Sequence, residues 1–99
     1  MNNFGEKVRN LRESKGLLLR QAAAYIEVDT AFLSKVERGE KKATREQAVR
    51  LSAFLGVNDS ELLDLWLTDK LLEVVENEPT GINCLQFSIK FLKKVRSNV

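Results

Sequence analysis

The amino-acid sequence predicts an all-α fold, with five helices that share one core and an additional helix at the C-terminal end. Three observations support this prediction. The chain has 99 residues, 43% of them hydrophobic and 30% charged, which suits about one globular domain. Apolar residues recur at helical spacing, and no segment shows the alternation of a convincing strand. Residues that start and stop helices mark the boundaries between these segments.

Three capping boxes predict where helices begin. In a capping box, an N-cap side chain and the side chain three residues later satisfy each other's backbone amides. The candidate pairs are Asn3 with Glu6, Thr44 with Gln47, and Asn58 with Glu61. Asp29 is a further good N-cap.

The first four helices are expected over residues 4–14, 19–26, 30–38 and 45–55. The first, third and fourth of these are each followed by a glycine that can end a helix. These glycines are Gly16, Gly39 and Gly56.

The fifth helix is expected from residue 60 to about residue 77, and it is apolar over a wide arc that one small domain cannot easily bury. Pro79, Thr80 and Gly81 then break the helix. A sixth helix follows, because apolar residues recur at helical spacing along two neighbouring lines. These lines contain Ile82, Leu85, Ile89 and Leu92, and Phe87, Phe91 and Val95. We expect one unit over residues 1–78 and an additional C-terminal helix over residues 79–99, within a single compact domain.

The charge is unevenly distributed, although the net charge is only +2. Residues 1–50 hold 11 basic and 7 acidic residues, residues 51–80 hold 1 basic and 7 acidic residues, and residues 81–99 hold 4 basic residues and no acid. This division suits a chain of which one part meets phosphates. The alternative is that these charges are only solvated helix faces, as we expect for the four basic residues of the last helix.

Several function classes are disfavoured by composition. The chain has no histidine, and its only cysteine, Cys84, is expected to be a small buried apolar residue. A disulfide framework, a Cys/His zinc site and the usual catalytic constellations are therefore missing, so we expect no metal, no cofactor and no enzyme activity. No apolar run approaches the roughly 20 residues of a membrane span, and the N-terminus lacks a secretory signal, so we expect a cytoplasmic protein. No small-molecule ligand is evident.

The segment from residue 16 to residue 39 is the most informative part of the chain, because it predicts two short helices joined by a tight turn. Ala23 is small enough for two helix backbones to cross closely. Four apolar residues supply contacts that fix the crossing, namely Ile26, Val28, Leu33 and Val36. A second helix presented in this way fits the major groove of DNA.

The segment from about residue 4 to residue 63 resembles the helix-turn-helix domain shared by phage repressors and bacterial xenobiotic-response-element regulators. The resemblance rests on the sequence LSKVERG at residues 33–39, on LGV at residues 55–57, and on the pair Leu62 and Leu63. It implies a DNA-binding transcription regulator, in which Glu37 pairs with Arg12 of the first helix. The wider pattern of residues 17–47 is similar to small regulators found beside DNA methyltransferases and restriction enzymes, which implies a controller that is autoregulatory or acts on such a gene.

The sequence departs from this family at two places. Leu18 and Leu19 stand where the family usually has Ser-Gln, whose glutamine contacts a phosphate. Glu27 stands at the turn, where glycine is common because the backbone often has a positive φ. A glutamate in that conformation costs about 1 kcal/mol, so a differently shaped turn is the alternative.

The resemblance also implies which residues contact double-stranded DNA. The base-reading candidates on the third helix are Thr30, Ala31, Ser34 and Lys35. The phosphate-contact candidates are Arg20, Gln21, Arg38, Lys41, Lys42 and Arg45. Free backbone amides at the start of the fourth helix add to the second group.

One recognition helix contacts too few base pairs for useful discrimination, so we expect a homodimer on a two-fold axis. The interface candidates are Trp66, Leu67, Leu71, Val75, Ile82, Leu85, Ile89 and Leu92, several of which must also serve the core. The alternative function is an antitoxin or adaptor whose last helix binds another protein. Repressor and activator are not distinguished by the sequence.

Overall fold

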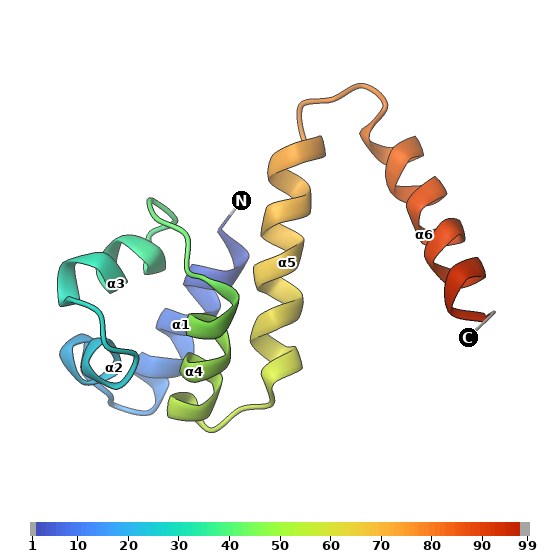
Figure 1. Cartoon of the computed structure of the whole chain (residues 1–99). Coiled ribbons are helices and arrows are strands. Elements are labelled where there is room, and N and C mark those ends of the chain that lie inside the picture. The colour runs from blue at the N-terminus through green and yellow to red at the C-terminus, as the bar shows by residue number, and fades with distance from the viewer. Residues whose placement is uncertain (1, 98–99) are drawn as a thin grey trace.

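The computed structural model describes residues 2–97, which form six α-helices and no strand (Figure 1). The helices are α1 (Asn3–Ser14), α2 (Leu19–Tyr25), α3 (Thr30–Glu37), α4 (Arg45–Leu55), α5 (Asp59–Val75) and α6 (Gly81–Ser97). The all-α prediction is confirmed, and each predicted helix end lies within two residues of the observed end. None of the helices in this range is long and apolar enough to cross a membrane.

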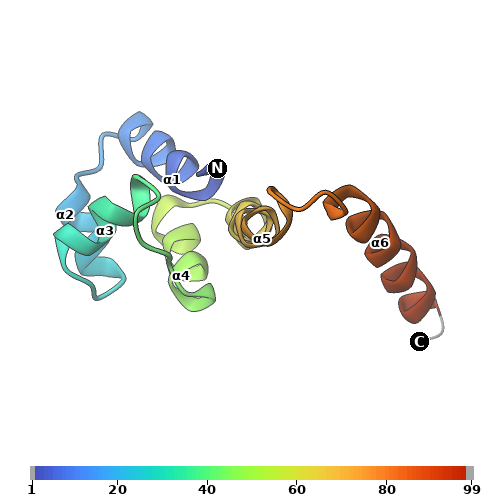
Figure 2. The same cartoon turned by 90° about the horizontal axis from the view of Figure 1, so that it is seen from above.

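Helices α1 to α5 surround one core, and α5 lies along α1 and α4 (Figures 1 and 2). The buried apolar side chains are Phe4, Val8, Ala22, Ala23, Ile26, Leu33, Val36, Ala43, Ala48, Leu51, Leu55 and Leu62. Every one of the five helices contributes to this set or packs against it. Burial of this shared core is the main favourable term that fixes α2 and α3 on the body.

The caps explain most helix boundaries. The box at the start of α4 is confirmed, because the Gln47 amide donates to Thr44 Oγ1 (3.1 Å) and the Thr44 amide donates to Gln47 Oε1 (2.9 Å). Asn58 does occupy the N-cap of α5, but its side chain makes no capping hydrogen bond. The box predicted for α1 is wrong, because Asn2 is the cap and accepts from the Gly5 amide (3.2 Å).

The turn between α2 and α3 has the left-handed conformation that the family usually gives to glycine. Glu27 adopts φ of 61° there, so the turn keeps its shape although the residue has a side chain. Its carboxylate accepts a hydrogen bond from Arg50 Nη1 at 2.9 Å, which ties the turn to α4. This contact raises the pKa of Arg50 above its ordinary value. The alternative of a differently shaped turn is therefore wrong.

Helices α1 and α3 are in close backbone contact at Gly5. A Cβ at this position would lie 2.4 Å from the Val36 carbonyl oxygen and 2.7 Å from that of Glu37. No real Cβ atom tolerates such distances to backbone, so only glycine fits. The Asn2 side-chain amide also donates to the Glu37 carbonyl at 2.8 Å, so the start of α1 holds the end of α3 in place.

Helix α6 stands apart from the five-helix body, on the far side of α5 from α1 and α4 (Figures 1 and 2). Within residues 2–97, α6 comes close to the body at its first residue, Gly81, whose backbone lies against Val75 of α5. Cys84 is exposed on α6, so the prediction of a buried cysteine is wrong. The reason is that no described segment covers this helix. The division into residues 1–78 and 79–99 stays a prediction.

Candidate nucleic-acid interface

Helices α2 and α3 form a compact pair. Ala23 lies buried at their crossing, and the Val28 amide donates to the Ala23 carbonyl at 3.0 Å, which closes the turn. Asp29 caps α3 as predicted, since its Oδ1 accepts from the Phe32 amide at 2.6 Å. Leu33 and Val36 are buried, and Phe32 packs half-buried against the core. The inner side of α3 is thereby fixed, and its opposite side faces outwards.

The outer face of α3 carries all four base-reading candidates. Thr30, Ala31 and Lys35 are exposed, and Ser34 is half-buried. Positions three and four residues apart share a helix face, which links Ala31 to Ser34 and Lys35, and Thr30 to Ser34, in one continuous surface. It offers hydroxyl groups, a methyl group and an ammonium group within less than two helical turns, and these groups can meet base edges.

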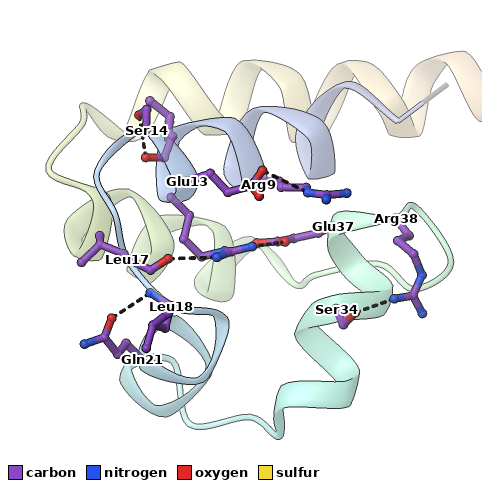
Figure 3. A network of polar contacts seen from close by, with 11 residues as sticks. Arg9, Glu13, Ser14, Leu17, Leu18, Gln21, Ser34, Glu37 and Arg38 are labelled. Carbon is purple, nitrogen blue, oxygen red and sulfur yellow. Dashed lines mark hydrogen bonds and ion pairs between the residues drawn. The ribbon is translucent and has the colours of Figure 1, made fainter.

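Arg38 is tied to the same face by a network of polar contacts (Figure 3). Its Nη1 donates to Ser34 Oγ, and its Nε donates to Glu40 Oε2. The contact with Arg38 holds the pKa of the Glu40 carboxyl below its ordinary value. Arg38, a phosphate candidate in the sequence, is therefore placed beside the base-reading candidates with a defined direction.

The start of α2 presents Arg20 and Gln21, both exposed. Gln21 Oε1 accepts a hydrogen bond from the Leu18 backbone amide at 2.8 Å (Figure 3). This bond fixes the first turn of α2 and uses only the oxygen of the side chain. The NH₂ group of Gln21 therefore remains able to donate to an anion.

The segment between α3 and α4 holds the other basic candidates. Lys41 and Arg45 are exposed, and no ion pair involves either of them within residues 2–97. Lys42 is also exposed, but its Nζ pairs with Glu73 of α5. The capping box uses the amides of Thr44 and Gln47, so the amides between them have no partner within the helix. Lys41 and Arg45 are thus more available to an anion than Lys42.

An almost buried ion pair fixes α3 against α1 (Figure 3). Arg12 Nε donates to Glu37 Oε2 at 2.8 Å, and its Nη2 donates to Glu37 Oε1 at 3.0 Å. The remaining Nη1 donates to the Leu17 carbonyl at 2.9 Å, at the start of the segment that leads to α2. The hydrogen bond to Glu37 raises the pKa of Arg12, against the opposing effect of its burial. The pairing implied by the resemblance is confirmed, and one guanidinium positions both helices.

The comparison with known proteins agrees with this geometry. A helix-turn-helix family model matches residues 8–62, a segment that includes the α2–α3 pair and the core around it. The chain belongs to this helix-turn-helix family. The resemblance drawn from the sequence is thereby confirmed.

Two control proteins are similar to this chain over most of their own length. The control protein C.BamHI of Bacillus amyloliquefaciens is 32% identical over 62 residues, which cover 62% of this chain and 76% of that protein. The control protein C.MunI of Mycoplasma sp is 35% identical over 60 residues, which cover 60% of this chain and 81% of that protein.

The crystal structure of the clp gene regulator ClgR from Corynebacterium glutamicum is similar with a TM-score of 0.61 and 25% identity, over 88% of this chain and 90% of that chain. This chain is thus a helix-turn-helix transcriptional regulator.

The helix-turn-helix unit depends on polar contacts that sequence patterns did not reveal. Asp69 of α5 accepts hydrogen bonds from the amides of Asn3 (3.2 Å) and Phe4 (2.8 Å), and from the Asn3 side chain (3.0 Å). Trp66 Nε1 donates to the Ala43 carbonyl at 2.8 Å and so holds the segment before α4. In the sequence, only one feature pointed to these contacts. Asp69 and Trp66 each end in a polar group, and they lie three positions apart on one helix face.

The dimer-interface candidates of this helix-turn-helix protein fall into two groups. Trp66, Leu85 and Val75 are half-buried in their own chain, and Trp66 packs against the core. The others are exposed, with 47% of Leu71 and 73% of Ile82 accessible to solvent. These exposed members are Leu67, Leu71, Ile82, Ile89 and Leu92.

Proposed function

We propose that the protein is a homodimer that binds DNA in a sequence-specific manner and reads a two-fold operator through the major groove with α3. The observation that carries this proposal is the outer face of α3, which is exposed while its inner face is buried in the core. A helix held at both ends, by the Asp29 cap and by the Arg12 pair, can enter a groove without losing its own structure.

Each base-reading candidate suits a different base edge. Thr30 can exchange one hydrogen bond, Ala31 can pack on a thymine methyl, and Lys35 can donate to guanine O6 and N7. The Ser34 oxygen already accepts from Arg38, so its hydroxyl proton is the group left to donate. Lys35 is the strongest candidate, because it is the charged residue of the four and its side chain is exposed.

Phosphate contacts on either side would set the orientation of α3. The candidates on α2 are Arg20 and Gln21, and those after α3 are Arg38, Lys41, Lys42 and Arg45. Such contacts supply affinity without reading sequence, and each one steepens the dependence of binding on salt. We expect a smaller contribution from Lys42, because it would have to leave Glu73.

A homodimer is proposed because one helix reads too few base pairs for a useful specificity ratio. Two copies of α3 about 34 Å apart would meet successive major grooves on one face of the DNA. The α2–α3 pair lies at the opposite end of the molecule from α6 (Figure 2), so an interface near α5 and α6 would leave both α3 helices free.

The more specific part of the proposal concerns which genes the protein controls. Two of the similar proteins are named as control proteins, so we propose that this chain regulates its own gene or a neighbouring DNA methyltransferase or restriction gene. Its relatives are bacterial, so we place it in the cytoplasm, where bacterial DNA lies. No catalytic activity is proposed.

The second candidate function is an antitoxin or adaptor whose α6 binds a different protein. The uncovered apolar side chains of α6, such as Phe87 and Phe91, favour it. An obligate protein partner would co-purify in a fixed ratio, whereas a homodimer would not need one.

Selection of binding sites from random duplex DNA tests the proposed function. The full chain should enrich one motif with two-fold symmetry, whose half-sites have centres about one helical turn apart. Enrichment of no motif above the input pool, at several salt concentrations, would contradict the proposal.

A further inference from the structure

Apolar surface is exposed on the two helices that carry the proposed dimer interface. On α5, Leu67 and Val74 point away from the core, with 52% and 73% of their surface accessible. On α6, Phe87 is 71% accessible, and most other apolar side chains are about half exposed. Exposed apolar side chains gathered on two neighbouring elements are typical of a surface that binds another chain.

The apolar arc of α6 is too wide for one neighbouring helix. At 100° per residue, it runs from Phe87 through Val95 and Leu92 to Ile82, over roughly 220°. A helix that packs on a single neighbour needs an apolar stripe of only about 100°. The arc therefore requires contacts on two sides, and folding α6 back onto its own α5 would provide only one.

The corner between the helices keeps α6 away from its own α5. The Glu78 amide donates to the Val75 carbonyl (3.0 Å), and the Gly81 amide donates to the Glu78 carbonyl (2.9 Å). The Gly81 backbone is packed so tightly that a Cβ would lie 2.6 Å from the Val75 carbonyl oxygen. The two helices consequently diverge from this corner, and α5 and α6 face each other without packing (Figure 2).

The charges of the two helices are complementary. Helix α6 has four basic residues and no acidic residue; Lys90, Lys93 and Lys94 lie beside its apolar arc, and Arg96 lies within the arc in the last turn. The segment of residues 51–80, which contains α5, has seven acidic residues and one basic residue. Of the acidic residues on α5, Asp64 and Glu61 are exposed and form no ion pair within residues 2–97. The basic side of α6 is therefore attracted to α5, whereas two copies of α6 can meet favourably only through their apolar arcs.

We propose that the occupant of this surface is a second copy of the chain, in an exchange of C-terminal arms. The α6 of each protomer enters the space between α5 and α6 of the other, with one side of its apolar arc on the partner's α5 and the other side on the partner's α6. This inference rests on the proposed homodimer and specifies how it is built. The two-fold axis repeats each contact, so two chains cover both surfaces and the assembly ends at a dimer. The four helices form a bundle at the opposite end from both α3 helices.

Zero-length coupling of amines to carboxylates tests the exchange. Unlabelled and ¹⁵N-labelled protein are mixed, left to exchange subunits and treated with a carbodiimide, and the crosslinked peptides are identified by mass spectrometry. Arm exchange predicts couplings from Lys90, Lys93 or Lys94 to carboxylates of α5, with light–heavy peptide pairs as abundant as same-label pairs. If these couplings occur only in same-label pairs, α6 folds onto its own α5 and the inference is overturned.

A matched pair of variants adds a second measurement. Ile89→Glu puts a carboxylate in the apolar arc, whereas Gln86→Glu puts the same charge on the polar side of the same helix. Sedimentation should show that Ile89→Glu raises the dimer Kd at least about a hundredfold, and that Gln86→Glu leaves it nearly unchanged. Equal dimerisation of both variants would overturn the arm exchange while the homodimer stands. A wild-type chain that is monomeric at every concentration would instead contradict the proposed homodimer itself.

Discussion

Arg12 of α1 and Glu37 at the end of α3 lie 25 positions apart in the sequence and form a two-bond ion pair, with nitrogen–oxygen distances of 2.8 and 3.0 Å. Only 11% and 5% of these side chains are accessible to solvent. Because Lys35 precedes Glu37 by two residues on the same helix, the pair also fixes the direction in which the outer face of α3 points. The candidate DNA surface thus depends on a contact buried behind it.

Removal of one partner of this pair should be costly. Glu37→Ala leaves the Arg12 guanidinium buried without its carboxylate, and we expect it to lower the free energy of unfolding by about 3 kcal/mol. Urea denaturation followed by circular dichroism measures the change. Glu13→Ala is the control, because Glu13 pairs with Arg9 at the exposed surface and should cost less than about 1 kcal/mol. Equal losses in the two variants would refute the structural role of the Arg12 pair.

Gly5→Ala should destabilise the protein, although alanine is the better helix former. The new methyl group would meet the Val36 and Glu37 carbonyl oxygens, which are backbone atoms and cannot move aside. We expect a loss of about 2 kcal/mol in the free energy of unfolding. Gly16→Ala meets no atom within 4 Å and should cost only about 1 kcal/mol through its positive φ. An unchanged or higher stability of Gly5→Ala would show that α1 and α3 are farther apart.

Asp69→Ala should separate the start of α1 from α5. Three hydrogen bonds end on this carboxylate, two of them from backbone amides of the first helical turn. Since these donors would lose a charged partner, we expect a loss of about 2 kcal/mol in the free energy of unfolding. Glu73→Ala removes a carboxylate one turn later on α5 that makes only an exposed ion pair with Lys42, and it should change stability by less than about 1 kcal/mol. A loss as small as that of the control would mean that Asp69 does not anchor α1.

Glu27→Gly should stabilise the protein. Glycine adopts the left-handed conformation of this turn without the clash of a Cβ atom, a gain of about 1 kcal/mol. The lost ion pair with Arg50 is exposed and offsets only part of this gain. Thermal unfolding should show a rise of roughly 4 °C in Tm. Arg50→Ala measures the ion pair alone, and a lower Tm for Glu27→Gly than for Arg50→Ala would disprove strain at the turn.

Features set by neighbouring residues could be predicted from the sequence. The helix bounds and the Thr44–Gln47 box follow from local hydrogen bonding, and Asp29 caps α3 for the same reason. Asn2 and Asn3 show the limit of this approach, since both are good caps and the choice between them depends on Asp69, 66 positions away from Asn3. A pattern of local spacing carries no information about such a distant partner.

The candidate site was predictable in outline. Burial of Leu33 and Val36 fixed which side of α3 faces outwards, so the exposure of Thr30 and Lys35 followed from helical periodicity. The pairing of Lys42 with Glu73 was not predictable, because it requires the position of α5 beside the loop after α3. Cys84 was misassigned because an apolar pattern shows which face seeks contact, but not whether the same chain supplies that contact.

The central claim is that α3 reads DNA sequence, and a salt series of binding tests it most directly. Wild type, Lys35→Ala and the control Lys15→Ala, at an exposed lysine at the end of α1 outside every proposed contact, are titrated with the selected site and with a scrambled duplex. We expect Lys35→Ala to weaken binding to the selected site about tenfold or more and to relax preference at one position of each half-site, with Lys15→Ala like wild type. If Lys35→Ala keeps the full preference of wild type at every salt concentration, or if wild type has none, α3 does not read the sequence in the way proposed.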